Sequence, residues 1–126
     1  MNVLLDTCAL LALSRGDLPS RAAAALRAAP EAHVSVVAAW EVAIKVAAGK
    51  LSLSESTQDW FTGLLRHHRL LELPLDSQMV CAAAALPPIH RDPFDRILVA
   101  LAQSRTLTVL SSDRVIPQYP GIKVLW

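Results

Sequence analysis

Five short, mainly apolar stretches alternate with helical sequence along this chain, and the alternation restricts its fold more than any other feature. The stretches lie at residues 3–5, 33–36, 70–73, 108–110 and 122–125. Short strands that are separated by helices pair in parallel, because each helix returns the chain to the same end of the sheet. We therefore expect an α/β fold with a mostly parallel central sheet of about four to five short strands. Helices should cover both faces of this sheet.

Residues that begin or end helices mark the segments between these strands. We expect helices at residues 8–13, 19–29, 37–48, 54–68, 76–86 and from residue 93 onwards. Ser54 and Asp76 are expected to be N-caps, and Gly49 suits the position that follows a helix. Asp76 is interpreted as a cap and not as a site residue.

The clearest helix start is at Asp92-Pro93, in front of the apolar run 97–102. Asp92 is a good N-cap, and Pro93 suits the first helical position, where its missing N–H costs nothing. Asp95 then falls in the first turn, near the positive end of the helix dipole. Asp95 is either a site residue or simply a favourable first-turn acid, and this segment alone leaves both interpretations open.

Apolar residues of the helix over 37–48 have the spacing of a buried stripe. They are Val37, Trp40, Ile44 and either Ala47 or Ala48, and we expect them to be buried. Glu41 then lies at the margin of this stripe, where it can reach a site. The alternative is that Glu41 only forms an i,i+4 ion pair with Lys45.

The composition is that of a single globular domain, which we expect to span residues 1–126. The chain is 53% hydrophobic and has a formal net charge of +1, so any nucleic acid must be contacted by local patches. Cys8 and Cys81 are expected to be reduced and buried. The sequence shows no basic, apolar leader and no stretch long and apolar enough to span a membrane, so we expect a cytoplasmic protein.

Four acidic residues are expected to meet at one edge of the sheet. Asp6 and Asp113 follow predicted strands, and ligand sites of parallel α/β sheets lie at the carboxyl ends of the strands. Asp95 lies at the start of a helix, and Glu41 lies about one turn into another, so all four carboxylates can face one crevice.

Four carboxylates in one crevice repel one another unless their pKa values rise or a cation binds. Oxygen ligands of this kind suit Mg²⁺, or alternatively Mn²⁺, and do not favour zinc. Such an ion can activate a water molecule towards a phosphorus atom. Thr7 and Ser111 supply hydroxyls next to the acids, so they can hydrogen-bond to a carboxylate.

Basic residues flank the acids. Arg91, Arg96 and Arg114 are candidates for binding substrate phosphates, although each suits a solvated surface position equally well. His90 lies near the acids without a second histidine to act as its acid–base partner, so we expect it to orient the loop.

The patterns of other chemistries are missing from the chain. Its four glycines are scattered, so there is no phosphate-binding loop and no dinucleotide-binding turn. No serine lies in a GxSxG turn, and nothing indicates a base beside either cysteine.

Several segments resemble the PIN-domain family, and more narrowly the VapC-type ribonuclease toxins of bacterial type II toxin–antitoxin pairs. They are LLDTCALLAL at 4–13, WEVAIK at 40–45, GKLSL at 49–53, HRDPFDRILVALA at 90–102 and TVLSSD at 108–113. The resemblance extends over essentially the whole chain, including the tail from residue 119 to 126. It implies a single PIN domain.

The resemblance also implies a function and a site. It makes Asp6, Glu41 and Asp95 the principal metal-binding acids, and Asp113 the fourth acid. Ser111 stands where the family often has threonine, and it keeps the hydroxyl. The implied reaction is Mg²⁺-dependent endonucleolytic hydrolysis of RNA, which leaves 5′-phosphate and 3′-hydroxyl ends. The implied partners are a second copy of the chain and a cognate antitoxin that blocks the active-site groove.

Two alternatives remain at this point. The first is a PIN-like module that binds RNA or protein without cutting it. The second is a receiver-like or phosphatase-like acidic pocket. The second is disfavoured because Thr7 and Cys8 follow Asp6, which gives neither an adjacent acidic pair nor a DxD arrangement.

Overall fold

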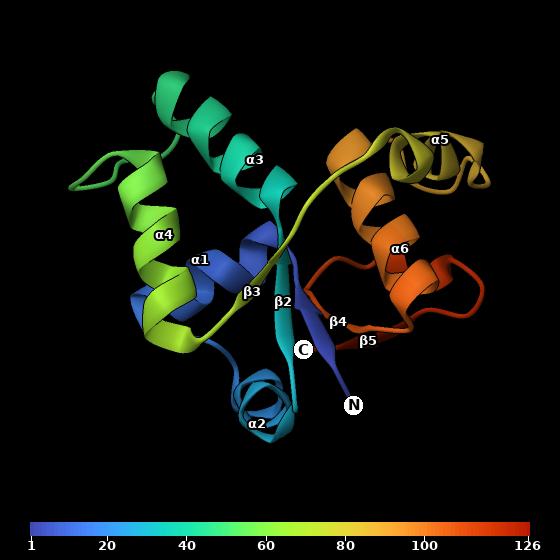
Figure 1. Ribbon diagram of the computed structural model, residues 1–126, viewed down its shortest axis with the longest axis horizontal. Helices are drawn as coiled ribbons and strands as arrows, with labels where there is room; N and C mark the ends of the chain where they lie inside the picture. Colours follow the sequence, from blue (N-terminus) through green and yellow to red (C-terminus); the bar gives the residue numbers. More distant parts are fainter.

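The five strands form one parallel sheet in a computed structural model that describes residues 1–126 (Figure 1). In chain order they are β1 (Val3–Leu5), β2 (Ala32–Ser35), β3 (Leu71–Leu73), β4 (Thr108–Leu110) and β5 (Lys123–Leu125). Their spatial order is β3-β2-β1-β4-β5, and every neighbouring pair is parallel. The predicted α/β fold is confirmed, and β3 and β5 lie at the two edges of the sheet.

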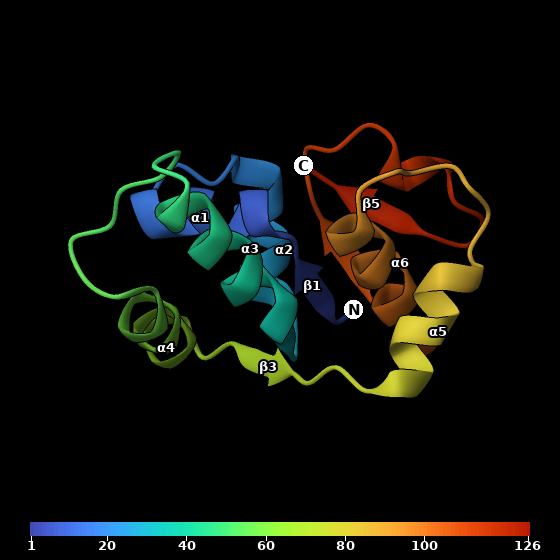
Figure 2. The same cartoon turned by 90° about the horizontal axis from the view of Figure 1, so that it is seen from above.

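Six α-helices and one short 3₁₀ helix connect the strands. They are α1 (Thr7–Arg15), α2 (Ser20–Ala28), α3 (Val36–Ala47), α4 (Thr57–His68), α5 (Ser77–Ala85), α6 (Pro93–Arg105) and η1 (Ile116–Gln118). Figures 1 and 2 show α1 and α4 on one side of β1 and α5 and α6 on the other. None of these helices has the length and apolar character that crossing a membrane requires.

Alternate side chains of β1 enter two separate cores, one on each face of the sheet. Val3 and Leu5 pack in a cluster that includes apolar residues of α1 to α4. Leu4 points to the opposite face and packs in a cluster with residues of α6 and with Ile116 and Tyr119. All three β1 residues are fully buried. The central strand is thus held on both faces, and its carboxyl end has a fixed position.

Three of the helix ends have the predicted chemistry. The Asp92 carboxylate accepts a 2.8 Å hydrogen bond from the N–H of Phe94, and Asp76 accepts one of 2.9 Å from Met79. Gly49 follows α3 with a φ of +73°, which glycine adopts without strain.

The expected cap at Ser54 is wrong by two residues. Ser56 caps α4 instead, by accepting a 3.1 Å hydrogen bond from the N–H of Asp59. This start places Asp59 in the first turn of α4, where its negative charge interacts favourably with the helix dipole.

The predicted buried stripe of α3 is wrong at every residue except Val37, because Ala47 and Ala48 at its end are exposed as well. Val37 is buried, but Trp40 is 58% exposed and Ile44 is 45% exposed. The residues that pack beside Val37 are Ala38 and Val42. Because α3 is apolar around most of its circumference, periodicity could not decide which side faces the sheet.

Both cysteines are free, but their expected burial is wrong. Cys8 lies in the first turn of α1, where its Sγ is 3.3 Å from the hydroxyl of Ser112, and it is exposed. Cys81 is exposed on α5, where Ala83 is the residue that packs inward.

Candidate active site

Asp6 directly follows the central strand and also caps α1. Its Oδ1 accepts a 2.7 Å hydrogen bond from the N–H of Ala9. Its Oδ2 accepts a hydrogen bond from the hydroxyl of Ser111, which follows the neighbouring strand β4. Asp6 is 5% exposed, so its carboxylate is held rigidly at the carboxyl end of the sheet.

Asp113 follows β4 and is oriented by backbone donors at the start of η1. Its Oδ1 accepts hydrogen bonds of 2.7 Å from the N–H of Val115 and 3.0 Å from that of Ile116. The N–H of Asp113 itself donates to the hydroxyl of Ser111. These contacts leave Oδ2 of Asp113 to face the other acids.

Glu41 and Asp95 come from two helices that begin near the same edge. Glu41 lies in the second turn of α3, and Asp95 is the third residue of α6. The Thr7 hydroxyl donates a 2.7 Å hydrogen bond to Oε1 of Glu41, and Nζ of Lys45 lies 3.1 Å from Oε2. The alternative ion pair of Glu41 with Lys45 therefore exists, and it coexists with a position in the site.

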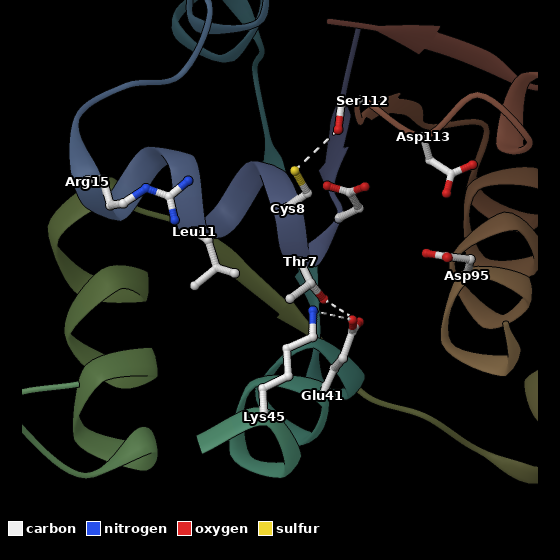
Figure 3. A pocket seen from close by; sticks show the side chains of 10 residues that line it. Thr7, Cys8, Leu11, Arg15, Glu41, Lys45, Asp95, Ser112 and Asp113 are labelled. Carbon is white, nitrogen blue, oxygen red and sulfur yellow. Dashed lines mark hydrogen bonds and ion pairs between the residues drawn. The ribbon is translucent and has the colours of Figure 1, made fainter. Parts of the chain in front are cut away.

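All four predicted acids line one pocket (Figure 3). In this view the labelled Glu41, Asp95 and Asp113 lie around the same space, on α3, on α6 and in the segment after β4. The pocket is lined by Asp6, Thr7, Cys8, Leu11, Arg15, Glu41, Lys45, Asp95, Ser112 and Asp113. The fold thus brings together acids that are up to 107 positions apart in the sequence, which is the separation of Asp6 and Asp113.

The pocket disfavours negative charge on two of its acids. Burial raises the pKa of Asp6 to about 6, against the opposing effect of its hydrogen bonds with Ser111 and Ala9. Burial also raises the pKa of Asp95 to about 7, and the nearby carboxylate of Asp92 adds to this shift.

Asp113 behaves in the opposite way. Burial alone would raise its pKa, but hydrogen bonds from His90 and from two backbone N–H groups lower it on balance. The pocket therefore combines one carboxylate that ionises readily with two that ionise reluctantly.

The residues of the pocket fit a divalent cation. Its candidate ligands are carboxylate oxygens, which Mg²⁺ and Mn²⁺ accept readily. A cation would offset the burial that raises the pKa values of Asp6 and Asp95. Asp95 and Asp113 each offer an oxygen within 4.8 Å of the other and of a nitrogen of His90.

The predicted role of His90 describes only part of its contacts. It does orient its loop, because its Nδ1 accepts a 3.1 Å hydrogen bond from the N–H of Asp92. Its Nε2, however, lies 3.1 Å from Oδ2 of both Asp95 and Asp113. The position of His90, five residues before Asp95, indicates that it lies near the acids. That spacing does not show which way the ring points.

Lys45 and Arg15 are pocket residues that the sequence analysis did not select as phosphate-binding candidates. Lys45 was considered only as an ion-pair partner of Glu41. Arg15 lies in the last turn of α1, where its Nε is 3.4 Å from Asp17. Their side chains reach the pocket along α3 and α1, a convergence that sequence spacing does not reveal.

The three arginines predicted to bind phosphate have different surroundings. Arg96 is not available, because its guanidinium donates hydrogen bonds of 2.8–3.2 Å to six acceptors. Four of these are carbonyls at the end of α5 and just after it, so the prediction for Arg96 is wrong. Arg91 and Arg114 are exposed and do not line the acidic pocket.

Comparisons with known proteins agree with this fold. The sequence model of the PIN domain matches residues 3–122. A toxin–antitoxin complex from Klebsiella pneumoniae contains a similar chain, with a TM-score of 0.68 and 21% identity over 98% of this chain and 96% of that one. DNA-bound VapBC from Salmonella typhimurium gives a TM-score of 0.71 and 20% identity over 99% and 97% of the two chains.

A third similar structure is VapBC2 from Rickettsia felis, bound to a DNA fragment from its promoter. Its TM-score is 0.70 at 13% identity, over 99% of this chain and 98% of that one. At these identities the structural matches concern the fold. No curated protein sequence matches the chain significantly.

Proposed function

The chain belongs to the PIN-domain family, and from that premise we propose that it is a Mg²⁺-dependent endoribonuclease, the toxin of a type II toxin–antitoxin pair of the VapC type. The observation that carries the proposal is the convergence of Asp6, Glu41, Asp95 and Asp113 on one pocket at the carboxyl edge of the sheet. Carboxylates gathered in this way serve a metal-dependent hydrolase better than they serve a binding surface, where their repulsion has no use.

In the proposed site Asp6, Glu41 and Asp95 hold the divalent cation, and Asp113 is the fourth acid. Mn²⁺ suits the same oxygen ligands. When bound, such a cation lowers the pKa of a water molecule and offsets negative charge on a phosphate. The reaction is attack by water on an RNA phosphodiester, which leaves a 5′-phosphate on one product and a 3′-hydroxyl on the other.

Neighbouring hydroxyls hold these acids, and basic residues of the pocket contact the substrate. Thr7 and Ser111 donate hydrogen bonds to Glu41 and Asp6, and so fix the direction of their carboxylates. Lys45 and Arg15 are the cations that line the pocket, so we assign the contacts with substrate phosphates to them. Arg91 and Arg114 are free to contact the RNA further from the cleaved bond.

We also propose two protein partners, a second copy of the chain and a cognate antitoxin, in the cytoplasm. The similar chains from Klebsiella pneumoniae and Salmonella typhimurium come from toxin–antitoxin complexes, which supports the antitoxin. The support for a homodimer is the exposed apolar face of α3, which presents Val36, Trp40 and Ile44 to solvent.

The experiment is cleavage of total cellular RNA by the purified protein, after any co-purified partner has been removed under denaturing conditions and the chain refolded. We expect cleavage with Mg²⁺, none with EDTA, and none by Asp6→Asn, with 5′-phosphates at the new ends. Glu55→Gln is the control for the loss of an acid, because Glu55 is exposed and lies outside the pocket. RNA binding that persists in EDTA without any cleavage would favour the binding-module alternative.

A further inference from the structure

His90 bridges two of the four acids. Its Nε2 lies 3.1 Å from Oδ2 of Asp95 and 3.1 Å from Oδ2 of Asp113. The two aspartates come from different elements, the first turn of α6 and the loop after β4. The imidazole is therefore the one side chain that contacts both, and its own side chain is only 12% exposed.

The hydrogen bond at Nδ1 determines which nitrogen of the ring carries the proton. Nδ1 accepts a 3.1 Å hydrogen bond from the N–H of Asp92, so Nδ1 carries no proton. The one proton of the ring then lies on Nε2, which faces the two carboxylates as a donor. The Asp92 N–H thus selects the tautomer that can donate a hydrogen bond to Asp113 and that places Nε2–H 3.1 Å from Oδ2 of Asp95.

This tautomer excludes Nε2 as a metal ligand in the observed loop conformation. A ligating nitrogen needs a free lone pair, which would move the proton to Nδ1. Nδ1–H would then face the N–H of Asp92, donor against donor. His90 and the two carboxylates are close enough together to surround a cation. The N–H of Asp92, however, keeps the ring proton on Nε2, so the ring acts as a donor and not as a ligand.

The backbone of His90 is fixed as firmly as its ring. Its N–H donates a 2.8 Å hydrogen bond to the hydroxyl of Tyr119, and its carbonyl accepts one of 3.2 Å from Arg96. Tyr119 is 2% exposed and also accepts a hydrogen bond from Arg96. The imidazole consequently has little freedom to move away from the acids.

We propose that His90 is a positioning residue: its Nε2–H hydrogen-bonds to the carboxylate of Asp113 and lies 3.1 Å from that of Asp95, so that the pair is already arranged for a divalent cation. The inference rests on the proposed function, because it concerns the same site. A carboxylate oxygen has a second lone pair, so Oδ2 of Asp113 can accept from His90 and still face the pocket. Groups that hydrogen-bond to metal ligands in this way typically contribute about 10–100-fold to metal affinity.

Two substitutions separate the two hydrogen bonds of the ring. In His90→Gln the side-chain amide N–H₂ reaches the position of Nε2 and can donate to the carboxylates, but the acceptor for Asp92 is lost. In His90→Asn the side-chain oxygen replaces Nδ1 as the acceptor, but no donor reaches the acids. His67→Asn, at an exposed position of α4, is the control for a histidine substitution as such.

The first readout is Mn²⁺ binding by titration calorimetry without RNA, with each variant's melting temperature in EDTA as the check on folding. We expect His90→Asn to bind Mn²⁺ about 10–100-fold more weakly than wild type, and His90→Gln to retain most of the affinity. Equal affinity in all variants, or loss in His90→Gln with retention in His90→Asn, would overturn the inference. If wild-type protein cleaves RNA and binds Mn²⁺ in those cases, the proposed nuclease stands without it.

The second readout is the ¹⁵N chemical shifts of the His90 ring in the metal-free protein, which distinguish a protonated from an unprotonated nitrogen. A neutral ring with its proton on Nε2 supports the inference. A proton on Nδ1, alone or together with one on Nε2, overturns it. This measurement involves no metal and no RNA, so its outcome is independent of the nuclease proposal. A wild-type protein that binds no divalent cation would overturn both proposals.

Discussion

The hydroxyl of Thr7 donates a 2.7 Å hydrogen bond to Oε1 of Glu41, which joins the first residue of α1 to the second turn of α3. The other oxygen of Glu41 lies 3.1 Å from Nζ of Lys45. Both oxygens of the carboxylate therefore have a partner, and its direction is fixed. Thr7 is buried, so its side chain is held in place beside Glu41.

Replacement of Thr7 tests the importance of this contact. Thr7→Val keeps the shape of the side chain but removes the donor, and we expect it to lower the cleavage rate about tenfold, as is common for groups that orient metal ligands. Thr7→Ser keeps the hydroxyl and should retain most of the activity. Initial rates on a short RNA substrate at saturating Mg²⁺ distinguish the two. Loss of activity in Thr7→Ser with retention in Thr7→Val would mean that the methyl group matters and the hydrogen bond does not.

Asp95→Asn tests the acid whose negative charge the pocket disfavours most. Because burial raises the pKa of Asp95 to about 7, the neutral amide should suit the pocket of the metal-free protein better than the carboxylate does. We expect the variant to lose cleavage by at least about 100-fold and to melt at the same temperature as wild type or higher in EDTA. Cleavage assays and thermal unfolding measure the two effects. A fully active variant would remove Asp95 from the site.

Arg96 illustrates a residue whose role is structural although it lies beside the site. Its guanidinium donates to six oxygens, and four of them belong to the end of α5 and the turn that follows. Arg96→Ala leaves these acceptors without a donor, so we expect a loss of about 2–4 kcal/mol in the free energy of unfolding. Arg91→Ala, at an exposed position, should change it by less than about 0.5 kcal/mol. Urea unfolding at fixed pH gives both values, and similar values for the two variants would contradict this role.

Much of the fold follows from local sequence. The caps at Asp76 and Asp92 and the glycine at 49 lie where the sequence indicates, because each depends on one residue and its immediate neighbours. The convergence of Asp6 and Asp113 also follows, since both come directly after strands of one parallel sheet.

Other features depend on packing between distant elements, which spacing alone does not encode. α3 is apolar on most of its surface, so the choice between the Trp40 side and the Val42 side is made by the sheet and not by the helix. The contacts of Arg96 and His90 also depend on distant elements. Arg96 donates to backbone carbonyls around the end of α5, and His90 lies beside the carboxylates of two other segments. A charged residue beside a cluster of acids predicts proximity, but it does not predict which atoms it contacts.

The exposed face of α3 leads to a prediction about self-association. Ile44 is 45% exposed and lies one turn from Trp40, so a charge at this position should disrupt an apolar interface without disturbing the core. We expect Ile44→Lys to shift the protein from dimer to monomer in size-exclusion chromatography with light scattering, at an unchanged melting temperature. Ala28→Lys places the same charge on an exposed position of α2 and should leave the dimer intact. A wild-type protein that is monomeric at high concentration would contradict the proposed homodimer.

The raised pKa values of Asp6 and Asp95 predict how stability depends on pH in the absence of metal. Their pKa values in the folded protein are about 6 and about 7, against 3.8 for an unperturbed aspartate. Between about pH 4 and pH 7 the folded state therefore binds more protons than the unfolded state, and this contribution to the free energy of unfolding falls as pH rises. For Asp6 the difference amounts to on the order of 2–3 kcal/mol across the window.

Urea unfolding in EDTA at about pH 5 and about pH 7.5 measures this effect, with Asp6→Asn as the comparison. The contribution of His33 has the opposite sign, because burial lowers its pKa and stability is then lost as pH falls, but it is common to both proteins and cancels in the difference. We expect wild type to lose more stability than Asp6→Asn as the pH rises. Mg²⁺ should reverse the trend in wild type, because a cation binds the deprotonated carboxylates and stabilises the fold most at high pH. If Mg²⁺ leaves the pH dependence unchanged, Asp6 is not a metal ligand, whatever the cleavage assay reports.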